Sequence, residues 1–156
     1  MVKMSREEEF DKMMASLFEM ARYISVYENT PRRYQTQNLY MTEVHAISLI
    51  AHREGLNLTQ LAKLTNRTKG AISQMIEKLR KRGLVDKRPS AQNASELLLH
   101  LTDDGWAVYH YHQQMEQRIY QTFLERMPAF SSQDFHRCFE ILEGIKQAAS
   151  SRWNKK

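Results

Sequence analysis

The spacing of hydrophobic residues divides the chain into three parts, and the first is a long amphipathic segment. Ser5 and Glu8 have the spacing of a capping box, and apolar residues follow at intervals of three and four as far as Asn29. This periodicity predicts a long first helix. Residues 30–38 are mostly polar and contain Pro31, a pattern that predicts a loop.

The second part, residues 41–102, contains shorter helical patterns followed by a change to alternating apolar positions. Three helices are predicted: one capped by Thr42 and ended by Gly55, one over 58–65, and one over 68–82. After Gly83, the runs "LVDKR" and "ELLLHL" are typical of strands, and the segment between them is polar. We interpret 41–102 as a winged helix-turn-helix module, with its wing over 84–101.

The third part, residues 103–156, predicts two further helices. Thr102 precedes one that runs to Pro128, and Ser131 with Asp134 forms a second capping box that opens the other. The apolar stripes of the first and the last two helices exceed what a module of ~60 residues covers, so we expect a homodimer. The predicted fold is mainly α, with a small two- to three-stranded β wing. A winged helix-turn-helix core is flanked by long N- and C-terminal dimerisation helices, in one domain over 1–156 whose first part is 1–40.

Charge is concentrated in one short segment of the chain. The net charge is +5 and the pI is about 9.4, yet residues 67–88 alone hold eight Lys and Arg against Glu77 and Asp86. A local excess of this kind is typical of nucleic-acid binding. The lone Cys138 excludes a disulfide framework, and neither a leader nor a membrane-spanning run is recognisable, so we expect a cytoplasmic protein with no membrane partner.

The predicted helix 68–82 separates apolar from polar residues. At 100° per residue, Ala71, Ile72, Met75, Ile76 and Leu79 fall on the face expected to enter the core. The opposite face begins with short or amide side chains, which suit a helix that reads base edges, and Gln74 is the best candidate for a contact to adenine. Three cations at the far end, Arg80, Lys81 and Arg82, are expected near phosphates or simply solvated. Glu77 is expected to pair with Lys81.

The stretch "LTQLAKLTNRTKGAISQMIEKLRKRGLVDKRPS", followed by "LLLHLTDDG", resembles the core of MarR-type transcriptional regulators, and the helix order on both sides agrees. The resemblance implies a homodimeric regulator, usually a repressor, bound to a near-palindromic site on double-stranded DNA. The wing departs from the family pattern because Asn93, Ala94 and Ser95 stand where an arginine-bearing tip is common. The residues expected to contact DNA are Thr59, Arg67, Thr68, Lys69, Gly70, Ser73, Gln74, Lys78, Lys87 and Arg88.

The resemblance also implies release from DNA by an effector, for which a small aromatic or lipophilic ligand is the main hypothesis. Its candidate contacts are the aromatic residues Phe18, Tyr23, Tyr40, Trp106 and Tyr109. Metal sensing through His45, His112 and Glu116 is an alternative, although polar surface is the ordinary role of such side chains. Oxidation sensing is not expected, because Cys138 lies among apolar residues and is expected to be buried and inert.

Two other classes of function differ in the support that the sequence gives them. A dimeric, antirepressor-like protein with weakened DNA contacts is an alternative that the arginine-free wing tip suggests. An enzyme is not expected, because the sequence has no phosphate-binding Gly-rich loop and no nucleophile elbow. No cofactor is expected either.

Overall fold

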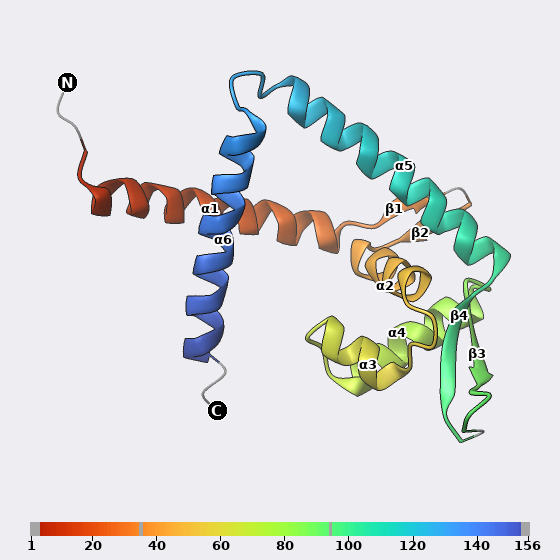
Figure 1. Cartoon of the computed structure of the whole chain (residues 1–156). Coiled ribbons are helices and arrows are strands. Elements are labelled where there is room, and N and C mark those ends of the chain that lie inside the picture. The colour runs from red at the N-terminus through yellow and green to blue at the C-terminus, as the bar shows by residue number, and fades with distance from the viewer. Residues whose placement is uncertain (1–3, 35, 94, 154–156) are drawn as a thin grey trace. The chain divides into compact units, whose positions relative to one another are not determined.

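The computed structural model describes residues 4–34, 36–93 and 95–153. Within them the chain forms six helices and two antiparallel strand pairs (Figure 1). Contacts group the residues into two compact units, Met1–Gln114 and Met115–Lys156, which one unbroken helix joins. In the described ranges, no helix combines the length and the hydropathy that a membrane crossing requires.

Helix α1 (Arg6–Asn29) begins and ends where the sequence predicts. The Ser5 hydroxyl accepts a hydrogen bond from the Glu8 amide at 3.1 Å, and the Glu8 carboxylate accepts one from the Ser5 amide at 2.7 Å. No described residue of α1 is buried, and Phe18 and Tyr23 are more than 60 % exposed. The apolar stripe of α1 is therefore uncovered in a single chain.

A β-hairpin replaces the loop that the sequence predicted after α1. Strands β1 (Arg32–Tyr34) and β2 (Gln37–Leu39) pair antiparallel, with Tyr34 opposite Gln37. Tyr34 and Leu39 are fully buried, so the hairpin is anchored by one apolar side chain from each strand. Strands of three residues are too short to show an alternating pattern, which explains why the prediction was wrong.

Helices α2 (Met41–His52), α3 (Leu58–Leu64) and α4 (Lys69–Lys81) form the core with a two-stranded ribbon (Figure 1). The N-cap of α2 is Tyr40 and not the expected Thr42, because Glu43 accepts a hydrogen bond from the Tyr40 amide. The ribbon pairs β3 (Val85–Pro89) with β4 (Leu97–Leu101), and a single bridge from Asn57 to Leu98 adds the trace of a third strand. Side chains with almost no exposure fill this core: Val44, Ile47, Leu61, Ile72, Ile76, Leu79, Leu84 and Leu99.

Helix α5 (Asp103–Glu125) packs closely against the base of the ribbon. The Thr102 hydroxyl accepts a hydrogen bond from the Gly105 amide at 3.1 Å and donates one to the Gly83 carbonyl at 2.5 Å. A Cβ atom on Gly105 would overlap the carbonyl oxygen of Leu84. Glycine is therefore required where α5 meets the wing.

Helix α6 (Ser132–Trp153) begins at the second predicted capping box. Asp134 accepts a hydrogen bond from the Ser131 amide at 2.8 Å, and the bonds from the Ser131 hydroxyl and amide lower the pKa of Asp134. Cys138 is exposed, which corrects the expectation of a buried thiol. The apolar neighbours that suggested burial, such as Phe139 at 59 % exposure, are themselves uncovered.

Candidate nucleic-acid interface

Helix α4 buries one face and leaves the other to solvent. Ile72, Ile76 and Leu79 are fully buried, as predicted. Ala71 is exposed and Met75 only half-buried, so the sequence prediction was wrong for Ala71. Ala71 lies about 100° from Ile72 around the helix, at the edge of the buried stripe.

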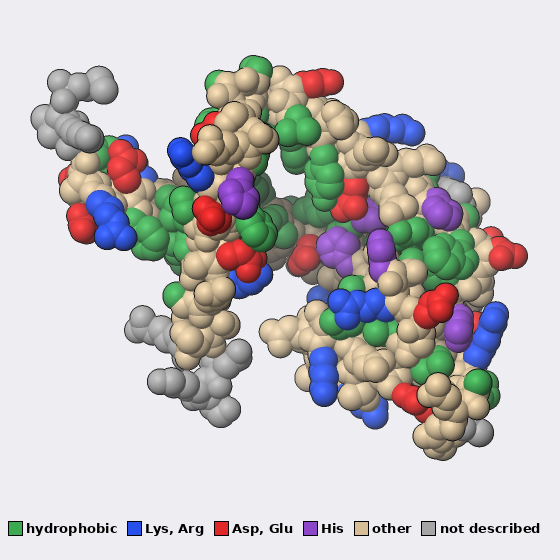
Figure 2. All heavy atoms as spheres, viewed as in Figure 1, with side chains coloured by type: hydrophobic (Ala, Val, Ile, Leu, Met, Phe, Trp, Pro, Cys, Tyr) green, Lys and Arg blue, Asp and Glu red, His purple; other side chains and the backbone are tan. Residues whose placement is uncertain are grey.

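Most of the ten residues expected at DNA lie on the surface. Eight are exposed and two, Ser73 and Lys87, are half-buried. Thr68 is the N-cap of α4, and its hydroxyl accepts a hydrogen bond from the Ala71 amide at 3.2 Å. Figure 2 shows separate Lys and Arg side chains over the region that contains α3, α4 and the ribbon. The exposed residues are Thr59, Arg67, Thr68, Lys69, Gly70, Gln74, Lys78 and Arg88.

Glu77 pairs with two cations, and neither is the expected Lys81. Its carboxylate accepts a hydrogen bond from Arg80 Nε at 3.2 Å and another from the Lys87 ammonium. Both hydrogen bonds lower the pKa of Glu77, and the bond from Lys87 has the larger effect. The Lys87 side chain is only 17 % exposed. A contact between α4 and β3 therefore takes up one of the cations predicted to bind phosphate.

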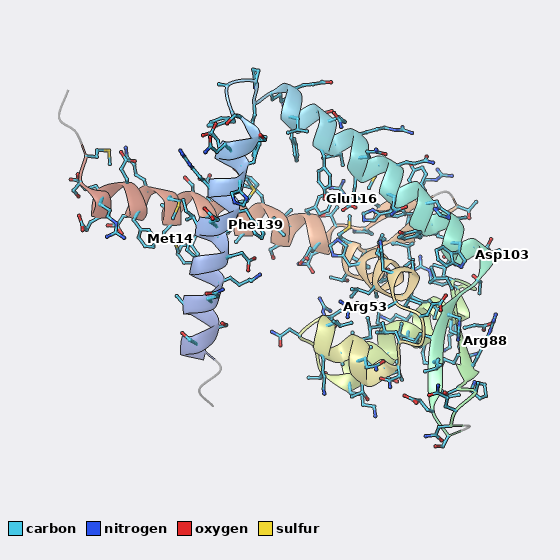
Figure 3. The ribbon with its side chains drawn as sticks, in the orientation of Figure 1. Met14, Arg53, Arg88, Asp103, Glu116 and Phe139 are labelled. Carbon is cyan, nitrogen blue, oxygen red and sulfur yellow. The ribbon has the colours of Figure 1, made fainter. Side chains whose placement is uncertain are left out.

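The wing has one strongly exposed cation at its base. The Arg88 side chain is 61 % exposed and extends outward from β3, with Asp86 at 3.8 Å (Figure 3). Towards the tip, Asn93 accepts a hydrogen bond from the Ser95 amide at 3.1 Å, while Ala94 lies outside the described residues. The described part of the tip thus presents amides and hydroxyls.

Arg82, the last of the three trailing cations, is directed into the protein. Its guanidinium contacts Gln37, Asn38 and Glu43, so it is neither simply solvated nor aligned with Arg80 and Lys81. Helical spacing gave no signal for this, because the partners lie about forty residues earlier in the chain.

The aromatic residues proposed for an effector differ in their exposure to solvent. Phe18, Tyr23, Tyr40 and Trp106 are exposed, whereas Tyr109 is buried. The Tyr109 hydroxyl lies 3.1 Å from His52 Nε2 and accepts a hydrogen bond from Gln113 at 2.6 Å. One cavity of about 340 Å³ is present beside α3, lined by Arg53, Glu54, Gly55, Leu56, Gln60, Lys63 and Leu64. None of the five aromatic residues belongs to it.

Histidine side chains gather where α2 and the first part of α5 lie (Figure 2). His112 is only 2 % exposed, which corrects its expected place on the polar surface, and its Nδ1 lies 3.2 Å from the Tyr34 hydroxyl. The ring of His45 lies 6.1 Å from that of His112, and Glu116 follows one turn later on α5 (Figure 3). His45 and His112 therefore lie close together within the first unit.

These elements define a winged helix-turn-helix protein: α3 and α4 joined by a tight turn, an exposed polar face on α4, and a two-stranded ribbon after it. Residues 39–96 match the model of the MarR family. This match covers the winged helix-turn-helix core of the chain, and members of that family are transcription regulators.

Individual relatives agree with this placement. An uncharacterised HTH-type transcriptional regulator of Bacillus subtilis, YhjH, is 33 % identical over 89 residues, which cover 54 % of this chain and 51 % of YhjH. The chain thus spans about half the length of that curated relative. Streptococcus pneumoniae FabT in complex with DNA has a TM-score of 0.69 at 17 % identity, over 93 % of this chain and 98 % of FabT. Lactococcus lactis ZitR, a zinc-responsive MarR family member, has a TM-score of 0.65 at 14 % identity, over 92 % of this chain and 99 % of ZitR.

Proposed function

We propose that the protein is a sequence-specific DNA-binding transcriptional regulator that inserts α4 into the major groove. The observation that carries this proposal is the outer face of α4. Its first turns present Lys69, Gly70 and Gln74 to solvent, while the opposite side is locked into the core by fully buried side chains. Short residues let a helix backbone approach the bases closely, and an amide side chain can pair with adenine.

The cations around α4 supply affinity in this proposal. Arg67 and Lys69 precede and open the helix, Lys78 lies on its exposed side, and Arg88 extends from the wing base. Contacts to phosphate fix a protein on the duplex but carry no sequence information. Recognition is therefore assigned to Gln74, with Ser73 beside it, and positioning to the cations.

We propose further that the active form is a homodimer on a near-palindromic site. The uncovered apolar side chains of α1 and α6 support this assembly, since α1 buries no described residue and Phe139 is 59 % exposed. Two-fold symmetry of the protein then implies two half-sites about one helical turn apart. Repression is the proposed outcome, because a dimer on a promoter blocks access to it.

Release by a small aromatic or lipophilic ligand is the proposed means of control. The exposed Trp106, whose ring contacts buried Tyr109 edge-to-face at 5.5 Å, is the most plausible contact of the candidate set. A ligand that binds only the conformation unable to hold DNA would lower the occupancy of the operator.

The proposal is tested with a duplex selected from a random pool by the purified full-length protein. Binding to the selected duplex should exceed binding to random DNA and should weaken steeply with salt. Gln74→Ala should relax base preference at one position in each half-site, at ~1–3 kcal/mol for the preferred base. Arg88→Ala should weaken all sequences equally and flatten the salt dependence. Failure to select any sequence would favour the antirepressor-like alternative.

Metal sensing through His45, His112 and Glu116 is a second candidate, favoured by the proximity of the His45 and His112 rings. A hydrogen bond between His112 Nδ1 and the Tyr34 hydroxyl would fix the orientation of the ring, as is usual for a ligating imidazole. One relative of the same fold, ZitR, is described as zinc-responsive. Calorimetric titration with Zn²⁺ tests the idea. Tight binding that His45→Ala abolishes would support it, and binding unaffected by that change would exclude this site.

A further inference from the structure

The C-terminus of α4 is fastened to the β1–β2 hairpin through one arginine. Arg82 Nε donates to the Gln37 side-chain oxygen at 3.1 Å, and another guanidinium nitrogen donates to Glu43 at 3.4 Å. The remaining nitrogen donates to the Asn38 carbonyl. The Gln37 side-chain amide donates to the Arg82 backbone carbonyl at 3.2 Å, so each of the two residues donates a hydrogen bond to the other.

The chemistry of these contacts requires the arginine fork. Glu43 is buried, with its side chain only 9 % exposed, and a buried carboxylate is stable only when it is paired and hydrogen-bonded. Three acceptors lie in different directions around one planar guanidinium, a geometry that a lysine ammonium on a flexible stem does not reproduce. The Gln37 amide also satisfies a carbonyl that the end of an α-helix leaves without a partner.

The hairpin is a fixed anchor for this contact. Tyr34 and Leu39 are fully buried, and Tyr34 lies opposite Gln37 in the register of the strands. The Tyr34 hydroxyl also contacts His112 on α5. Gln37, the partner of Arg82, therefore lies between two buried residues of the hairpin, Tyr34 and Leu39.

We propose that Arg82 is a positioning residue for DNA recognition: through Gln37, Asn38 and Glu43 it sets the orientation of α4 relative to the hairpin. The inference rests on the proposed function, and it assigns Arg82 a role different from that of Arg80 and Lys81. A helix end that is free to shift would present Gln74 and the first turn to the bases at variable angles. Misplacement of this kind lowers affinity without removing a contact to phosphate.

The test compares Arg82→Lys, Arg82→Gln and Gln37→Ala for binding to the selected duplex over a range of salt concentrations. A residue that binds phosphate tolerates lysine, so Arg82→Lys would bind normally and Arg82→Gln would lower the log–log salt slope of the homodimer by ~1.8. A positioning residue gives the opposite pattern. We expect Arg82→Lys and Gln37→Ala each to weaken operator binding on the order of tenfold with an unchanged slope, and the double variant to be no weaker than either one, because the residues act together.

Two controls separate positioning from simple loss of stability. Ile47→Val in the core of α2 should lower the free energy of unfolding while leaving operator affinity unchanged below the melting temperature. Lys81→Ala removes an exposed neighbouring cation and should not reproduce the effect of Gln37→Ala. Normal operator binding by Gln37→Ala, or rescue by Arg82→Lys, would overturn the positioning role. Wild-type protein that selects no duplex would instead overturn the proposed function, so the two failures are distinguishable.

Discussion

Glu77→Gln removes the one carboxylate that lies on the exposed side of α4. In the structure that carboxylate holds Arg80 from the same helix and Lys87 from β3. Glutamine keeps the shape of the side chain but loses its charge, so neither cation remains fixed by an ion pair. Arg80, whose side chain is 50 % exposed, then becomes able to contact phosphate, and the less exposed Lys87 does so only if the wing base moves.

The expected gain follows from counterion release. Each additional phosphate contact steepens the log–log salt dependence by ~0.9, which corresponds to about eightfold tighter binding at 0.1 M than at 1 M salt. In the proposed homodimer, release of Arg80 alone adds two contacts and predicts a slope change of ~1.8, or about 60-fold, and release of Lys87 as well predicts ~3.6. The gain is independent of sequence and should appear fully on random duplex DNA.

Fluorescence anisotropy with a labelled random duplex, repeated over a series of salt concentrations, measures this slope directly. Glu7→Gln, which makes the same charge change in the exposed first turn of α1, is the matched control and should leave the slope unchanged. A Glu77→Gln slope equal to or flatter than that of the wild type would refute the reasoning, because the paired cations would then be unable to reach phosphate even when released.

Three further predictions concern the glycines and the second capping box. Gly105→Ala should destabilise the protein by about 1–3 kcal/mol in urea unfolding, because the new Cβ overlaps a backbone carbonyl; Gly144→Ala, whose Cβ meets no described atom within 4 Å, should not. Gly70→Ala should leave the free protein as stable or more stable, by up to about 1 kcal/mol, yet weaken operator binding; unchanged binding would contradict close approach of this turn to DNA. The lowered pKa of Asp134 means that its stabilisation is complete above its ordinary value of 3.8 and is lost as pH falls further. The protection of the amides at the start of α6, measured relative to the unfolded chain, should therefore fall only in that acidic range, and a loss of protection near neutral pH would contradict the assignment.

Features that depend on neighbours along the chain were predictable from the sequence. The capping boxes at Ser5 and Ser131 are present, because a side chain three residues away supplies each bond. The apolar period of α4 likewise gave its buried face and the exposed position of Gln74. The winged helix-turn-helix order followed from such local signals and was confirmed by the structure and the family match.

Features that depend on distant residues were not predictable from spacing. The sequence pattern could not show that Glu77 turns to Lys87 on another element, since the i,i+4 rule offers Lys81 equally well. It also gave no sign that Arg82 contacts residues of a hairpin, in a segment where the sequence predicts a loop. The exposure of Cys138 depends on whether other parts of the protein pack over α6, and the apolar residues around it in the sequence do not show this.

The structure changes what the basic segment 67–88 offers to DNA. Eight cations lie in it, but Arg82 is taken up by the buried Glu43, while Arg80 and Lys87 share Glu77. The five that remain are Arg67, Lys69, Lys78, Lys81 and Arg88, and the Arg88 contact to Asp86 is long, at 3.8 Å. A homodimer then makes at most about ten phosphate contacts from this segment, and its salt slope should be no steeper than about −9. Because the described wing tip adds no cation, a steeper slope would require contacts from outside the winged helix. In the proposed function, Ser73 and Gln74 on α4 supply the selectivity, and the internal ion pairs keep the affinity for random DNA low.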